Sequence, residues 1–122
     1  MEWKIGVVDD NSLEELIMEK LKELRNVLLN ANDFNWEDSL FLSSNEEWSL
    51  SSKCYLFNLD DLEDDEDLPK FALDNDFKYV LSIADVQDIV DNARQQLIEC
   101  SEKDLFDAFY YYFKNDAFKS FT

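Results

Sequence analysis

The sequence contains no histidine, one glycine and one proline among its 122 residues. Without histidine, the commonest proton carrier near neutral pH and the commonest transition-metal ligand are both missing. A single glycine, Gly6, cannot form the glycine-rich loops that cradle phosphates or dinucleotides. These absences exclude a histidine-assisted nucleophile and a phosphate loop, so we expect a protein that is not an enzyme and uses no cofactor or metal.

Cysteine and long apolar runs are also scarce. Cys54 and Cys100 allow at most one disulfide, and no apolar stretch approaches the roughly 20 residues of a membrane span. The N-terminus has neither the basic start nor the apolar run of a signal peptide. We therefore expect a cytoplasmic protein with two free thiols and no membrane contact.

Negative charge, in contrast, is abundant, because 29 acidic and 11 basic side chains give a net charge of −18. A field of this sign repels nucleic acid and anionic lipid and attracts basic surfaces over roughly a Debye length. We therefore expect no direct binding to nucleic acid. Hydrophobic residues make up 46% of the chain and aromatic residues 15%, far more than in a disordered acidic segment. The charge should thus lie on one folded domain.

The acids are concentrated in the stretch "NLDDLEDDEDLPKF" at residues 58–71, which places seven carboxylates in the eight positions 60–67. Residues 31–76 carry a net charge of −12, two thirds of the total. A Ca²⁺ loop is one interpretation, but the run lacks the alternating acids and the central glycine of an EF-hand. A solvated connection between two elements is a second, since unpaired carboxylates stay exposed.

A third interpretation is a docking face for a basic protein, with the acids steering the encounter and aromatic side chains holding the complex. The acids of this predicted face are Asp60, Asp61, Glu63, Asp64, Asp65, Glu66, Asp67, Glu46, Glu47, Asp74 and Asp76. The candidate anchors are Trp48, Tyr55 and Trp36. For Trp36 and Tyr55 we expect packing in the core instead.

Three helices are predicted by a serine followed three residues later by an acid, the pattern of a capping box. The pairs are Ser12/Glu15, Ser82/Asp85 and Ser101/Asp104. Apolar residues at three- and four-residue steps follow the first pair from Leu13 to Ala31, which predicts one amphipathic helix there. The second pair precedes a similar stripe that ends at Leu97.

The third helix contains five consecutive aromatics, "FYYYF", at residues 109–113. A helix cannot turn all five inward, so Phe109 and Phe113 should face the core together with Phe106. Tyr110 and Tyr111 should then point elsewhere. Either they cover an edge of the fold with their hydroxyls in water, or they contact a partner or a second copy of the chain.

Short β-favouring runs, "SLFLS" at 39–43, "KCYLFN" at 53–58 and "KYVLSI" at 78–83, predict strands, and a short helix is expected near Pro69 to Asp74. The resulting order predicts a single α+β domain over residues 1–122. A small sheet of about three strands should be packed with three main helices on one side.

The pattern "ADVQDIVDNARQQL" followed by "YYYFKNDAF", with "EEWSL" and a strand cysteine upstream, resembles an uncharacterised family of small acidic bacterial proteins. Some members are similar to immunity proteins of contact-dependent or related polymorphic toxin systems. The resemblance covers residues 34–118 and leaves the helical region 1–33 as an addition. It implies a cytoplasmic inhibitor that is made beside a toxin and neutralises it by tight binding, and it implies no catalytic residues.

Three hypotheses follow from these observations. In the first, the chain is an immunity protein that occupies the basic cleft of a nuclease toxin, since such a cleft must bind phosphates. In the second, it mimics nucleic acid and inhibits a DNA-binding protein, and in the third it is a carboxylate enzyme or a metal buffer. A toxin gene immediately upstream would favour the first and phage genes nearby the second, while the oligomeric state stays open.

Overall fold

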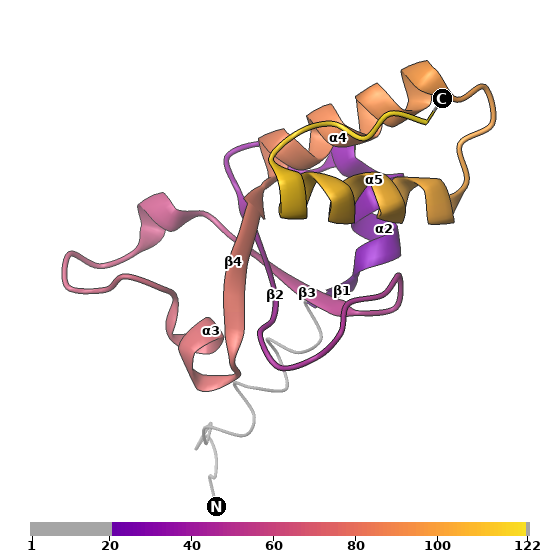
Figure 1. Cartoon of the computed structure of the whole chain (residues 1–122). Coiled ribbons are helices and arrows are strands. Elements are labelled where there is room, and N and C mark those ends of the chain that lie inside the picture. The colour runs from indigo at the N-terminus through magenta and orange to yellow at the C-terminus, as the bar shows by residue number, and fades with distance from the viewer. Residues whose placement is uncertain (1–20, 122) are drawn as a thin grey trace, which may run out of the picture.

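The structure is a computed structural model that describes residues 21–121, and these residues form an α+β domain with one antiparallel sheet (Figure 1). The elements in chain order are β1 (Lys22–Glu23), α2 (Leu24–Leu29), the 3-10 turn η2 (Ala31–Asp33), β2 (Ser39–Ser43), β3 (Lys53–Phe57), the 3-10 turn η3 (Leu59–Asp61), α3 (Lys70–Asp74), β4 (Phe77–Ser82), α4 (Ile83–Gln96) and α5 (Glu102–Asn115). The predicted class is confirmed, with four strands where about three were expected.

The sheet has the strand order β1-β3-β2-β4, and every neighbouring pair is antiparallel. Side chains alternate between its faces. Leu40 and Leu42 of β2 therefore share one face, and Phe41 points to the other. All three are fully buried. Strand β2 is thus covered on both sides.

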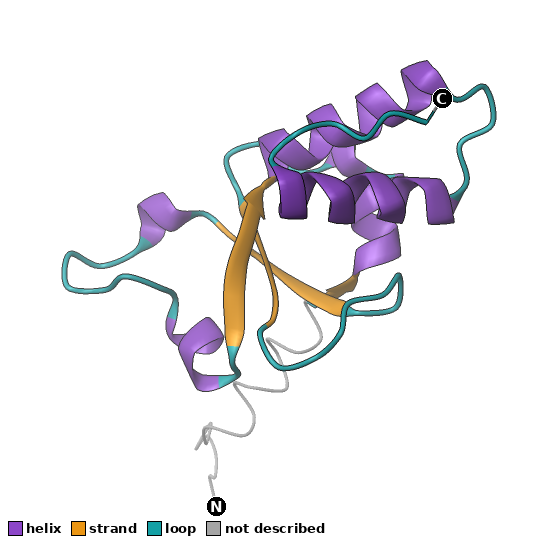
Figure 2. Cartoon of the chain, in the orientation of Figure 1, coloured by secondary structure: helices purple, strands orange, loops and turns teal. Residues whose placement is uncertain are grey.

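The helices α2, α4 and α5 gather on the face that carries Leu40 and Leu42 (Figure 2). Their apolar stripes bury Leu24, Val27 and Leu28 from α2, Val86, Ile89, Val90 and Ala93 from α4, and Leu105, Ala108 and Phe109 from α5. Phe106 and Phe113 pack partly buried against this cluster, as expected, and Phe109 is fully buried. The main core therefore lies between these three helices and the sheet.

Aromatic side chains form a second layer on the opposite face of the sheet. The ring of Phe41 lies 6.0 Å from that of Tyr55 and 6.1 Å from that of Tyr79. Helix α3 covers part of this layer through Phe71, whose ring lies 4.8 Å from Tyr55 and 5.7 Å from Phe77. The short helix thus joins the sheet from the side away from the main core.

The N-terminal helix differs from the prediction. Its expected start at Ser12 lies outside the described residues, and Lys22–Glu23 form strand β1, which pairs with β3. The expectation of helix through these two residues is therefore wrong, because the backbone pairs with a neighbouring strand. The first amides of α2, those of Leu24 and Arg25, donate to carbonyls of the β2–β3 loop at 2.8 and 2.9 Å. Those carbonyls replace a serine cap.

The other two predicted helix starts are confirmed. Ser82 Oγ accepts a hydrogen bond from Asp85 N at 3.1 Å at the start of α4. Ser101 and Asp104 form a complete capping box at the start of α5. In both places the hydroxyl satisfies an amide that has no partner within the helix.

Strand β4 contains a bulge that determines where its side chains point. Leu40 is paired with Leu81 and Phe41 with Tyr79, so Val80 is an extra residue on β4. Val80 and Leu81 both pack toward the main core. On the other side of the bulge, Lys78 is paired with Leu42 and so lies on the helix-covered face.

We expect Phe109→Ala to lower the free energy of unfolding by about 3–5 kcal/mol, because it opens a cavity at a fully buried site. Ser82→Ala should lower it by about 1 kcal/mol through loss of the cap on α4. Urea unfolding of the two variants and the wild type measures both values. Equal losses would contradict the central position of Phe109.

Candidate functional site

The acidic loop, defined as residues 60–67, follows β3 and begins within η3, and all seven of its carboxylates are exposed. The side chain of Asn58 starts it by accepting from Asp60 N at 2.9 Å. Farther along, Glu63 N donates to Glu66 Oε1 at 3.0 Å. These local hydrogen bonds shape the backbone and leave the charged groups in solvent.

None of the salt bridges between residues 21–121 involves a carboxylate of the acidic loop. The salt bridges between described residues join Arg25 and Lys53 to Glu23, Arg25 to Glu102, Lys70 to Asp74, and Lys103 to Asp107. The pKa of Asp38 is raised by burial and, to a smaller degree, by the charges of Asp61 and Glu37. Asp61, at the start of the acidic loop, thus lies near other carboxylates in a region with an excess of negative charge.

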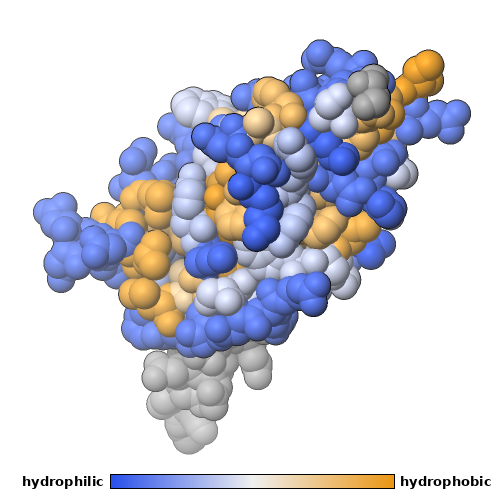
Figure 3. Space-filling model, viewed as in Figure 1, coloured by the Kyte–Doolittle hydropathy of each residue, from blue (hydrophilic) through white to orange (hydrophobic). Residues whose placement is uncertain are grey.

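Leucines are interspersed with the carboxylates. Leu59, Leu62 and Leu68 are half-buried, and Leu73 of α3 is 60% exposed. Figure 3 shows hydrophobic side chains beside hydrophilic ones over the region of the acidic loop and α3, at the left of the molecule. This surface therefore combines charge with apolar area, as protein interfaces commonly do.

The register of the sheet shows how the predicted acids are distributed. Strand β3 ends at Phe57 opposite Ser39, whereas β4 begins at Phe77 opposite Ser43, so residues 58–76 connect the two ends of the sheet. The acidic loop lies within this connection, and Asp74 and Asp76 lie at its far end.

Glu46 and Glu47 lie in the β2–β3 loop, which contacts that far end of the connection. Ser44 donates to the carbonyl oxygen of Asp76 from both its amide, at 2.8 Å, and its hydroxyl, at 2.7 Å. Glu46 and Glu47 also line a pocket of about 370 Å³ together with Asn75 and Phe77. The predicted acids therefore form two groups, the acidic loop and a group of four at the end of the sheet where β4 begins.

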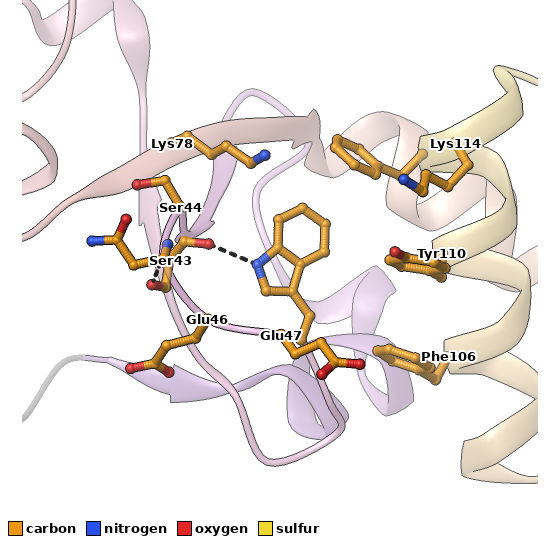
Figure 4. Close-up of a pocket in the computed structure, with 11 residues that line it drawn as sticks. Ser43, Ser44, Glu46, Glu47, Lys78, Phe106, Tyr110 and Lys114 are labelled. Carbon is orange, nitrogen blue, oxygen red and sulfur yellow. Dashed lines mark hydrogen bonds between the residues drawn. The ribbon is translucent and has the colours of Figure 1, made fainter.

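The β2–β3 loop also forms one wall of a cavity of about 470 Å³, named here the Trp48 pocket. Trp48 stands in it with its Nε1 donating to the carbonyl oxygen of Ser43 at 2.7 Å (Figure 4). Its ring lies 4.8 Å from that of Phe113 and 6.3 Å from that of Tyr110, both on α5. The pocket is lined by Ser43, Ser44, Asn45, Glu46, Glu47, Trp48, Lys78, Phe106, Tyr110, Phe113 and Lys114. It brings together four predicted site residues, Glu46, Glu47, Trp48 and Tyr110.

Two lysines border the Trp48 pocket on the side away from the glutamates in Figure 4. Lys78 Nζ lies 5.2 Å from the ring centroid of Trp48 and 5.5 Å from that of Phe113. Lys114 Nζ lies 5.6 Å from the centroid of Tyr110. Neither ammonium forms a salt bridge with a carboxylate of residues 21–121. The lysines thus contact aromatic faces, which attract cations.

The other aromatic candidates have different surroundings. Trp36 is 63% exposed, so the expectation of core packing for this residue is wrong. Tyr55 is half-buried in the aromatic layer, as expected. Tyr110 and Tyr111 are each 40% exposed and point away from the core, as predicted. Tyr110 stacks on Phe106 at 6.0 Å with the rings 12° from parallel, while Lys119 lies over Tyr111 at 5.7 Å.

Sequence reasoning did not identify Lys78, Lys114 or Phe106 as pocket residues. Lys114 and Tyr110 are four apart on a helix, a spacing that predicts their contact. Lys78 gives no such local signal, because it meets Trp48 only through the pairing of β4 with β2.

The two cysteines are free thiols, and the pKa of each is raised. Cys54 is buried, its Sγ donates to the carbonyl oxygen of Lys22 at 3.2 Å, and burial raises its pKa to about 12. The pKa of Cys100 is raised by burial and by the nearby Asp104. Because the thiolate is the reactive form, neither sulfur is suited to act as a nucleophile at neutral pH.

We expect Cys54 in the folded protein to resist alkylation by iodoacetamide at pH 8 and Cys100, which is only half-buried, to react faster. In urea both should react at similar rates, since unfolding restores an ordinary pKa near 8.5. Mass spectrometry of the two labelled peptides over time measures both rates. Rapid labelling of folded Cys54 would contradict its burial.

Residues 21–121 contain neither a metal site nor a membrane-spanning helix. Their acids and cysteines form no group of three or more that could hold a metal ion. None of their helices is both long and apolar enough to cross a bilayer.

Comparison with known proteins gives one match. No curated protein and no solved structure matches the chain. One family model, that of the domain of unknown function DUF7716, matches residues 21–121, which include every helix and strand described above. The chain therefore belongs to the DUF7716 family.

Proposed function

We propose that this chain is a non-catalytic acidic binding protein, an immunity protein that neutralises a nuclease-type toxin by occupying its basic surface in the cytoplasm. The observation that carries the proposal is the acidic loop, whose seven carboxylates are exposed and form no salt bridge with the described residues. Such a surface gains favourable interactions when a basic protein approaches.

The proposal assigns the acidic loop mainly to the rate of encounter. Charges at an exposed rim steer two proteins together and contribute less to the lifetime of the complex. Within the loop the carboxylates repel one another, and a basic partner relieves that repulsion. The leucines beside them, Leu62, Leu68 and Leu73, supply apolar area that a partner can cover.

A non-catalytic role agrees with the chemistry of the side chains. The chain has no histidine, and the pKa of each cysteine is raised. The acids of the loop are exposed to water, whereas catalytic carboxylates are commonly tuned by burial. These features favour binding over turnover.

Changing Asp61, Asp64, Asp65 and Asp67 to Asn should leave the fold intact and lower the association rate with the partner by about one to two decades at low salt. The wild-type rate should fall steeply toward about 0.5 M salt, where the field is screened. Dissociation should change less. Surface-binding kinetics against a basic toxin domain encoded beside the gene measure both rates.

A matched control removes four exposed acids elsewhere: Asp33→Asn, Asp88→Asn, Asp91→Asn and Glu99→Gln. It removes the same number of negative charges but should reduce the association rate several-fold less than the loop variant does. Equal rates for the two variants would mean that only total charge matters. Equal rates for the wild type and the loop variant at all salt concentrations would leave the acidic loop as a solvated connection and overturn the proposal.

A further inference from the structure

We infer that the Trp48 pocket is an anchor site for an arginine side chain of the protein partner. The inference rests on the proposed function and adds the place and the chemistry by which the partner is held. It is carried by the arrangement of two carboxylates and a stacked aromatic pair around one cavity of about 470 Å³.

The glutamate side of the pocket is open to a cation. In Figure 4, Glu46 and Glu47 lie on one side of Trp48, and both glutamates line the pocket together with Phe106. Phe106 and Tyr110 stack nearly parallel, with 12° between their rings. A planar cation that enters here meets aromatic surface and carboxylates together.

Arginine fits this arrangement better than lysine does. Its guanidinium is planar, stacks on aromatic rings and donates paired hydrogen bonds to carboxylates. The ammonium of a partner's lysine is a compact point charge that cannot stack in this way. The chain's own ammonium groups already cover the other aromatic faces, with Lys78 over Trp48 and Phe113 and Lys114 over Tyr110. Those two lysines repel a cation from their side, so the guanidinium is directed to the side of Glu46 and Glu47.

Charge complementarity favours a basic occupant over an acidic one despite the two lysines. The glutamates follow Ser44, which binds the backbone carbonyl of Asp76 through two hydrogen bonds, and the chain carries a net charge of −18. An anion approaching Lys78 and Lys114 crosses this negative field. A partner with a basic surface is drawn toward it.

The pocket is also fixed before the partner arrives. Trp48 is held by the hydrogen bond to the Ser43 carbonyl at 2.7 Å and by its contacts with Phe113 and Phe109 at 4.8 and 6.5 Å. A preformed site loses little conformational entropy on binding, which favours a long-lived complex. The acidic loop then affects mainly association, and the pocket affects mainly dissociation.

The test uses the whole protein and the peptide acetyl-Gly-Arg-Gly-amide at about 0.15 M salt, where the Debye length is about 8 Å. The indole N–H signals of Trp48 and Trp36 are followed by two-dimensional NMR. We expect the Trp48 signal to shift saturably with arginine, and the Trp36 signal, from a side chain 63% exposed outside the pocket, to stay in place. The same peptide with citrulline, which is nearly isosteric and uncharged, should produce little shift.

The double variant Glu46→Gln and Glu47→Gln should lower the affinity for the arginine peptide roughly tenfold, because each lost charge-assisted hydrogen bond weakens binding. The matched control Asp33→Asn and Asp88→Asn removes the same charge elsewhere and should bind as the wild type does. The inference is overturned if Trp48 shifts no more than Trp36, if citrulline acts like arginine, or if an acetyl-Gly-Glu-Gly-amide peptide shifts Trp48 instead. None of these outcomes depends on the acidic loop, so they leave the proposed function to its own kinetic test.

Discussion

The burial of strand β2 on both faces is the constraint that organises this domain. Leu40 and Leu42 pack under α2, α4 and α5, while Phe41 packs in the aromatic layer with Tyr55 and Tyr79. Because burying an unpaired charge is costly, a strand covered on both sides excludes charged side chains from the centre of the sheet. The charge is displaced to the connections at the ends of the strands.

The β2–β3 loop couples the parts of the domain that surround this strand. Its carbonyls at Leu50 and Ser52 accept from the first amides of α2, and its Trp48 lies against Phe113 of α5. Ser44 ties the same loop to the turn before β4. This one connection therefore contacts two helices and a strand, and its residues Ser44 and Trp48 also line the Trp48 pocket.

Locally encoded features could be read from the sequence. Ser82 and Ser101 cap their helices because a hydroxyl and an amide three residues apart meet without help from distant residues. The run at 39–43 forms β2 with the predicted bounds, and the inward position of Phe109 follows from helical periodicity. The exposure of the acidic loop follows from the cost of burying unpaired carboxylates.

Tertiary structure decided the features that depend on distant partners. Lys22–Glu23 are extended because β3 offers hydrogen bonds, although their apolar neighbours follow a helical period. Lys78 meets Trp48 only because a bulge at Val80 and the pairing with Leu42 turn it toward α5. The sequence by itself thus determined the caps of α4 and α5, the runs that form β2, β3 and β4, and the exposed acids. The pocket arises from strand register and helix packing, which join residues far apart in the chain.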